Sequence, residues 1–322
     1  MSTTVSSRVT GPPPVAAGRA ELLRALGAVA SSPPPHCGPA AAALGLPEPT
    51  RAEHTAVFVL SAPPHAAIHL GADGKLGGDA LDRAAGFWRA LGLSPPSDAD
   101  HLGVLLMLYA ELGDAESQAR GERTRGQLRR ARTALLWEHL WSWAPGYLTA
   151  VARLGTPSVS PWARLALRAL TREAREAEAP AALPLALRAA PPGLVAGGPG
   201  TAAGNGTGTA AAIRAGDAHL LNVLLAPVRS GIVLTREDLR RAAAAGGTGY
   251  RVGERRYTLQ AMLSQDAAAT LGWLSEFASR WACWHSEQQP VAGPDPRRWW
   301  TDRAAVTTVE LHELQERVAG CT

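Results

Sequence analysis

The chain has 322 residues, a formal net charge of +4, and 46% hydrophobic against 19% charged residues. This balance predicts a folded protein with one large or two smaller domains, and it excludes a disordered chain. No apolar run reaches the roughly 20 residues of a membrane helix, and the first residues lack the apolar segment of a secretory leader. We therefore expect a cytoplasmic protein without a membrane span.

The cysteines and the basic residues exclude further classes. Cys37, Cys283 and Cys321 are widely spaced and form no CxxC pair, so neither a disulfide scaffold nor a zinc or redox pair is expected. Lys75 is the only lysine among 32 basic residues. The arginine excess therefore indicates a compositional bias rather than a phosphate-binding surface. A general nucleic-acid binder would carry a more concentrated basic face.

Helical patterns dominate the first part of the chain. Residues 1–18 read as a disordered tail, and residues 19–190 as a helical domain that starts with Leu22, Leu23 and Leu26 at helical spacing. The glycine-rich residues 71–78 predict a long irregular loop, a kind of segment that often carries function. Further helices are expected over residues 79–91, 98–112, 136–147 and 161–170.

A change in composition separates the last third of the chain. Residues 191–208 read as a Gly/Ala/Pro linker, followed by an extension over residues 209–322. Thr235, with Asp238 three residues later, predicts a capped helix start, and residues 248–259 predict a short β-hairpin. The sequence therefore predicts an all-α helical bundle with a mostly helical C-terminal extension that contains one hairpin. Helices of this extension are expected over residues 209–225, 266–284 and 306–318.

Searches for catalytic motifs find none. The chain contains no phosphate-binding G-x-x-x-x-G-K-[ST], no G-x-S-x-G nucleophile elbow, and no second histidine after Glu138-His139 for a zinc-protease helix. No motif therefore indicates an enzyme, and no catalytic residue, metal site or cofactor is expected. A third possibility, an enzyme of another type built around His101 and His139, would be revealed by a bound metal or cofactor.

The pair Asp100-His101 at the start of the expected helix 98–112 is open to two interpretations. Ser97 can cap this helix with Asp100 completing a capping box, or Asp100 can belong to a binding site. A helix N-terminus disfavours an imidazolium ion, and a buried histidine needs a hydrogen-bond partner. His101 is accordingly either a satisfied core histidine or part of a pocket.

The tryptophan-rich helix raises a similar question. His139 is predicted to pack against its apolar neighbours rather than to ligate a metal. Trp137, Trp141 and Trp143 cannot all face inward on one helix, so at least one is expected to line a groove. Such a groove suits an apolar peptide better than a polar metabolite.

An arginine-rich segment at residues 229–256 supports an alternative function. Its expected helix, glycine turn and hairpin could form a winged-helix fragment with Arg251, Arg255 and Arg256 on the wing. This alternative is a regulator that binds nucleic acid. A solvated small subdomain is favoured over it, because only one helix clearly precedes the wing.

Five short motifs follow one another in an order that resembles a known family. They are Pro63-Pro64-His65-Ala66-Ala67-Ile68-His69-Leu70, Gly77-Gly78, Phe87-Trp88-Arg89-Ala90-Leu91-Gly92-Leu93, Asp100-His101-Leu102 and His139-Leu140-Trp141-Ser142-Trp143-Ala144-Pro145. Their order and spacing over roughly residues 19–175 resemble the TorD/DmsD family of cytoplasmic molybdoenzyme chaperones. The resemblance implies an all-helical, non-enzymatic protein. Such a protein binds the twin-arginine leader of a molybdoenzyme catalytic subunit and holds back export until the molybdopterin cofactor is inserted.

The resemblance also implies which residues contact the leader. The family's leader-binding positions carry over to Pro64, Ile68, Asp100 and His101, and less directly to Phe58 and Trp88. His69, Trp137 and His139 complete the candidate set. The expected partner is the client subunit through its leader peptide, nucleic acid is not expected, and the protein is expected to be a monomer or homodimer.

Overall fold

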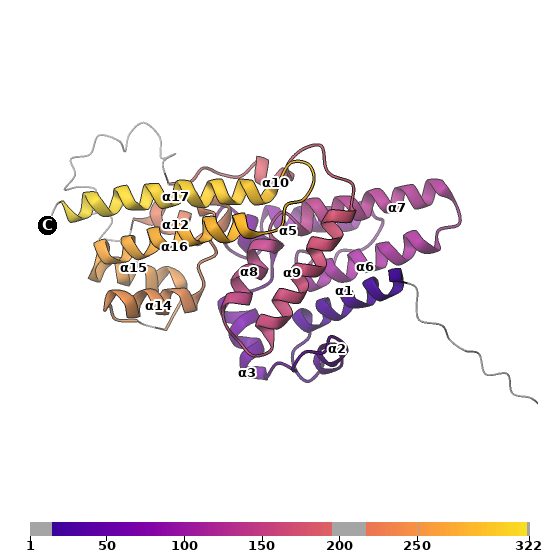
Figure 1. Ribbon diagram of the computed structural model, residues 1–322, viewed down its shortest axis with the longest axis horizontal. Helices are drawn as coiled ribbons and strands as arrows, with labels where there is room; N and C mark the ends of the chain where they lie inside the picture. Colours follow the sequence, from indigo (N-terminus) through magenta and orange to yellow (C-terminus); the bar gives the residue numbers. More distant parts are fainter. Residues whose placement is uncertain (1–14, 195–216, 251, 321–322) are drawn as a thin grey trace, which may run out of the picture.

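Helices form the regular secondary structure throughout the residues that this computed structural model describes, 15–194, 217–250 and 252–320 (Figure 1). The all-α prediction is confirmed for these ranges. In them, the isolated bridge between His65 and His101 is the sole β-type pairing. None of the helices in this part of the chain combines the length and apolar character that crossing a bilayer requires.

The first half of the chain forms a bundle around one apolar core. α1 and α6 lie side by side, and a Cβ atom at Gly27 would lie 2.7 Å from the carbonyl oxygen of Gly103, so glycine permits this close approach. The Trp162 indole N–H donates to the Leu26 carbonyl at 3.0 Å and ties α9 to α1. The elements are α1 (Val15–Ser31), α2 (Gly38–Ala43), α3 (Arg51–His54), the π-helix η1 (Thr55–Ser61), α4 (Ala66–Leu70), α5 (Asp79–Ala90), α6 (Leu102–Gln118), α7 (Glu122–Ala134), the π-helix η2 (Leu135–Leu140), α8 (Ala144–Arg153), α9 (Val159–Glu176) and α10 (Leu185–Arg188).

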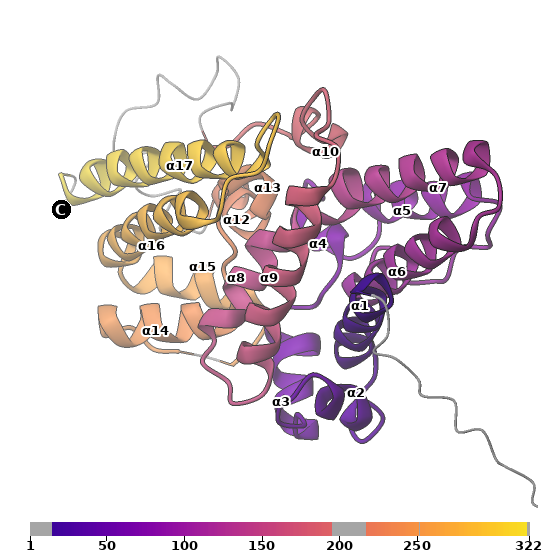
Figure 2. The same cartoon turned by 45° about the vertical axis from the view of Figure 1, so that its right-hand side comes forward.

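The C-terminal extension, meaning described residues 217–250 and 252–320, has an apolar core of its own. Its last two helices, α16 and α17, form a long antiparallel pair at one end of the molecule (Figures 1 and 2). The helix over Pro296–Ala319 begins ten residues before its predicted start at residue 306. The elements are α12 (Ala218–Leu225), α13 (Pro227–Ser230), α14 (Arg236–Gly246), α15 (Arg255–Gln265), α16 (Ala267–Glu287) and α17 (Pro296–Ala319).

Two local predictions in the extension have opposite outcomes. The capped start is confirmed, because Thr235 and Asp238 form a reciprocal capping box at the start of α14. The β-hairpin at 248–259 is wrong, because residues from Arg255 onward form α15. The cause is tertiary burial: Leu259 and Met262 lie three residues apart on one face of this helix and are buried in the core of the extension.

The extension packs directly on the N-terminal bundle. Trp300 of α17 is buried and donates its indole N–H to the Ser142 carbonyl at 3.0 Å. Trp300 and Val228 both belong to the apolar core of the bundle. Of the predicted tail, residues 1–14 lie outside the described residues, as does 195–208 of the predicted linker.

Two glycines with left-handed backbone provide a matched test of this packing. Gly231 has φ +74°, and a Cβ atom there would lie 2.4 Å from the Ala304 backbone nitrogen of α17. Gly247 has φ +64°, with no heavy atom of the described residues near its Cβ position. We expect Gly247→Ala to lower the free energy of unfolding by about 1–2 kcal/mol. Gly231→Ala should lower it by at least about 3 kcal/mol, because it adds a backbone clash. Urea denaturation of both variants measures the difference, and equal losses would contradict the close packing of α13 on α17.

Candidate functional site

The proline loop at residues 63–65 is joined to the segment that precedes α6. The Leu102 amide donates to the Pro64 carbonyl at 2.7 Å, and the Ala66 amide donates to the Asp100 carbonyl at 3.1 Å. Two adjacent prolines keep residues 63–64 out of a helix, so their backbone is available for this pairing. The motif around Pro64 and the Asp100-His101 pair are therefore one structural unit.

The Asp100 carboxylate is buried inside this unit and caps α4. Its Oδ2 atom accepts the Ala67 amide at 2.8 Å, and its Oδ1 atom lies 3.3 Å from His65 Nδ1. Burial raises the pKa of Asp100, but the hydrogen bonds from His65 and Ala67 outweigh it and leave the pKa below the ordinary value of 3.8. The predicted capping box from Ser97 to Asp100 is wrong, because α6 begins only at Leu102 and Asp100 serves a different helix.

His101 is the N-cap residue of α6. Its Nδ1 atom accepts the Gly103 amide at 3.1 Å, and its ring meets the edge of the His65 ring at 4.9 Å. Burial, with the nearby charge of His65, lowers the pKa of His101 to about 4. The ring is therefore neutral at neutral pH, and its hydrogen bond is the one expected for a satisfied core histidine.

Three further candidates pack beneath the same loop. Phe58 on η1 is buried and meets the edge of Trp162 at 5.2 Å. Ile68 and His69 are buried on α4, and the His69 ring stacks on Trp143 at 5.1 Å. Burial lowers the pKa of His69 to about 3, and the charge of Arg255 in the extension acts in the same direction.

The remaining candidates, Trp88, Trp137 and His139, lie outside η1, α4 and the Asp100-His101 pair. Trp88 is half-buried and packs beside Ala99, next to the Asp100 unit. Trp137 is buried, and its indole N–H donates to the Glu178 carbonyl at 2.9 Å. His139 is half-buried with its ring 5.0 Å from Phe87, and burial lowers its pKa to about 4. The structure thus brings together the candidates from residues 58–69 and 88–101, whereas the two from η2 pack with other partners.

The nine candidate side chains are all buried or half-buried, so the solvent-facing surface at this unit belongs to their neighbours. The His65 side chain is 21% exposed over Asp100. On η1, Val59 and Leu60 are 59% and 46% exposed, which is unusual for apolar side chains. His65 belongs to one of the family-like motifs but not to the nine candidates, and neither Val59 nor Leu60 is predicted from the sequence. Their exposure depends on how η1 packs, which no spacing reveals.

The extension covers another side of the unit. α13 packs against α4, and a Cβ atom at Gly74 would lie 2.2 Å from the Leu225 carbonyl oxygen. Gly74 has φ +65°, so the glycine-rich loop can turn here and leave room for the extension. Three cavities elsewhere in the described residues are lined by other side chains. In the described ranges, no group of three or more histidine, cysteine or acidic side chains could hold a metal ion.

Asp100 offers a test of this arrangement by pH. Its folded-state pKa is below 3.8, so the carboxylate stabilises the fold above that pH, and this contribution is lost as the pH falls through the folded-state pKa. Asp100→Ala leaves the buried Ala67 amide without its acceptor and should lower the free energy of unfolding by about 2–3 kcal/mol at neutral pH. The difference in the free energy of unfolding between Asp100→Ala and the native chain should become smaller at acid pH, and urea titrations can measure this. The control is Asp82→Ala at an exposed position of α5, which should lower the free energy of unfolding by about 1 kcal/mol or less.

Four buried or half-buried histidines predict a wider acid sensitivity. Burial lowers the pKa of His69 to about 3 and the pKa values of His101, His139 and His285 to about 4, against 6.5 in the unfolded chain. Below pH 6.5 the unfolded chain therefore binds protons that the folded chain does not. The free energy of unfolding should fall steadily from pH 7 to pH 5, and His139→Gln should make the decline shallower. A flat profile would contradict neutral burial of these rings.

Comparison with known proteins agrees with the resemblance found in the sequence. Residues 13–149 match the family model described as "Nitrate reductase delta subunit", and this range contains all nine candidate residues. No curated protein and no solved structure matches the chain. Residues 13–149 are thus similar to the nitrate reductase delta subunit family, a family of chaperones for molybdoenzyme maturation, which confirms the resemblance to chaperones of the TorD/DmsD type.

Proposed function

We propose that the protein is a cytoplasmic chaperone that binds the twin-arginine leader and the apoprotein of a molybdopterin oxidoreductase. It assists cofactor insertion before the client is exported and is not itself an enzyme. The family match over residues 13–149 carries this proposal, because it includes the loop at 63–70 and the Asp100-His101 pair. The client is the catalytic subunit of the molybdoenzyme.

The exposed apolar side chains just before the proline loop in the sequence would give the leader a place to bind. A twin-arginine leader has a basic start followed by an apolar segment. The exposed side chains of Val59 and Leu60 would contact the apolar segment. Pro64 and Ile68 are buried, so we assign them a positioning role rather than direct contact.

The basic start of the leader would lie at the edge formed by His65 and Asp100. The contact between His65 Nδ1 and Asp100 Oδ1 is 3.3 Å long, whereas charge-assisted bonds from nitrogen to a carboxylate are typically about 2.7–2.9 Å. A guanidinium group that displaced His65 would make a shorter bond to the same oxygen. Asp100 would then both fix the loop through Ala67 and supply the negative charge for the leader.

The described residues do not form the winged-helix fragment on which the nucleic-acid alternative depends. The segment expected as a wing forms α15. There the Arg255 guanidinium donates to the Leu234 carbonyl at 2.7 Å, and Arg256 donates to the Asn222 side chain. Both arginines are therefore engaged within the extension, and Arg251 lies outside the described residues.

Leader binding can be tested with paired serine variants. The probe is a synthetic peptide with two consecutive arginines followed by about 15 apolar residues. Val59→Ser combined with Leu60→Ser removes the exposed apolar surface and should weaken binding at least about tenfold in calorimetry. The matched control, Val306→Ser with Val309→Ser, changes two similarly exposed side chains on α17 and should leave the affinity unchanged.

Two results would contradict the proposal. The first is absence of binding to the native protein, and the second is an equal loss in both pairs of variants. A peptide with both arginines replaced by alanine should bind more weakly than the probe, because it lacks the charges that Asp100 would meet.

A further inference from the structure

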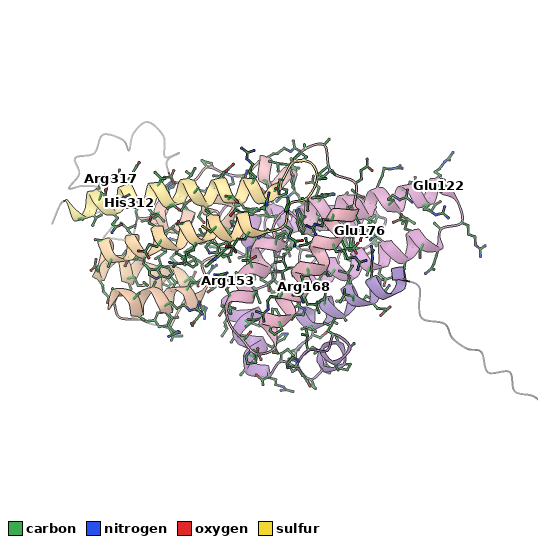
Figure 3. All side chains as sticks on the ribbon, in the orientation of Figure 1. Glu122, Arg153, Arg168, Glu176, His312 and Arg317 are labelled. Carbon is green, nitrogen blue, oxygen red and sulfur yellow. The ribbon has the colours of Figure 1, made fainter. Side chains whose placement is uncertain are left out.

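A furrow runs between the N-terminal bundle and the extension, away from the Asp100 unit. It consists of two adjoining cavities, about 440 Å³ and about 690 Å³, that share Arg153 of α8 and Trp284 of α16. α8 and α9 form one wall, and α14 and α16 form the other. Figure 3 shows Arg153, Arg168 and Glu176 along the middle of the face seen in Figure 1. Because both parts of the chain line it, the furrow exists only when they are packed together.

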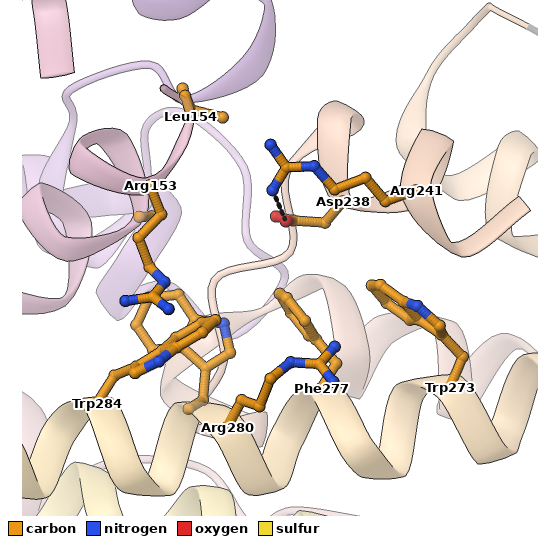
Figure 4. A pocket seen from close by; sticks show the side chains of 10 residues that line it. Arg153, Leu154, Asp238, Arg241, Trp273, Phe277, Arg280 and Trp284 are labelled. Carbon is orange, nitrogen blue, oxygen red and sulfur yellow. Dashed lines mark ion pairs between the residues drawn. The ribbon is translucent and has the colours of Figure 1, made fainter. Parts of the chain in front are cut away.

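Aromatic rings on α16 line the smaller cavity. Trp273 and Phe277, four residues apart, stack with centroids 4.9 Å apart and planes within 15°. Farther along the helix, the Arg153 guanidinium lies 3.3 Å from the centroid of the Trp284 ring (Figure 4). Phe277 is buried, so the half-buried Trp273 and Trp284 supply the apolar surface of the furrow on which an apolar side chain of a ligand can pack.

Positive charge dominates the two linings. They contain six arginines and three carboxylates, an excess of three positive charges in a chain whose formal net charge is +4. The arginines are Arg153, Arg168, Arg172, Arg175, Arg241 and Arg280, and the carboxylates are Glu176, Asp238 and Glu287.

Among the described residues, three of these arginines are free of ion pairs, and one of them, Arg153, also contacts the Trp284 ring. Arg153, Arg168 and Arg175 are exposed, and within the described residues none of them forms an ion pair. Partial burial lowers the pKa of Arg153, whereas the nearby Glu287 carboxylate acts in the opposite direction.

We propose that the furrow binds an acidic segment of a partner protein, with its Asp or Glu side chains at the free arginines and an apolar side chain on the rings of α16. The two adjoining cavities, about 440 Å³ and about 690 Å³, have room for several side chains of a peptide. The three carboxylates of the furrow interrupt the row of arginines. They would repel the continuous phosphates of a nucleic acid, whereas carboxylates spaced along a peptide can avoid them.

This inference does not rest on the proposed function. A twin-arginine leader carries the same sign of charge as the furrow, so the furrow would repel it. The acidic segment and the leader are therefore different ligands, and failure of one test leaves the other standing.

The test uses the full chain and a fluorescein-labelled peptide of alternating Glu and Phe residues. Saturable binding is expected in fluorescence anisotropy, and raising the salt concentration should weaken it, since the arginines are exposed. The triple variant Arg153→Glu, Arg168→Glu and Arg175→Glu should bind at least about tenfold more weakly. It should still fold, because these side chains are exposed and outside the ion pairs. Replacing the peptide's Phe residues with Ser should also weaken binding.

A charge-matched control variant carries the same three reversals outside the furrow, at Arg123, Arg130 and Arg298, which are exposed on α7 and α17. It should bind the peptide like the native chain. The proposal is overturned by no saturable binding up to about 100 µM peptide, by equal weakening in both variants, or by equal binding of a Lys/Phe peptide. Tighter binding of single-stranded DNA that the furrow variant loses would also overturn it, in favour of a nucleic-acid surface.

Discussion

The buried Asp100 carboxylate fixes the local structure on which the family motifs depend. It joins segments 33 residues apart by accepting the Ala67 amide hydrogen, and in a low-dielectric interior such a charge-assisted bond is strong. Without it, the first turn of α4 would leave a buried amide unsatisfied. With it, α4 is held in the orientation that stacks His69 on Trp143 and leaves His65 at the surface. The motifs are thus close in space because one carboxylate links them.

The sequence predicted those features that local chemistry controls. Thr235 and Asp238 correctly predicted a helix start, because a capping box needs only two suitable side chains three residues apart. The same reasoning failed at residues 248–259, where a short polar and aromatic alternation predicts a strand in isolation. The helix forms because Leu259 and Met262 are buried by helices that lie elsewhere in the sequence. The assignment of Asp100 to α6 failed for the same reason, since its real partner is 33 residues away.

The position of the C-terminal extension could not be predicted from spacing. It depends on contacts between distant residues, such as the bond from Trp300 to the Ser142 carbonyl and the close approach of Leu225 to Gly74. These contacts place part of the extension in the core of the N-terminal bundle. The extension is therefore a part of the packing around α4. Consequently the candidate residues on α4 are buried from two sides, by their own bundle and by the extension.

The two proposed surfaces have opposite electrostatic character, and this follows from how the extension packs. At the Asp100 unit, the carboxylate lies under a half-buried histidine, and exposed apolar side chains precede the proline loop in the sequence. Along the furrow, α16 supplies aromatic rings and α8 and α9 supply free arginines. A client with a basic, apolar leader and an acidic segment could occupy both surfaces at once. Two weak contacts on one client raise the effective concentration at the second site, so a chaperone can hold a protein firmly and still release either segment separately. Because opposite charges at the two surfaces disfavour an exchanged arrangement, they would also fix the direction in which the client binds.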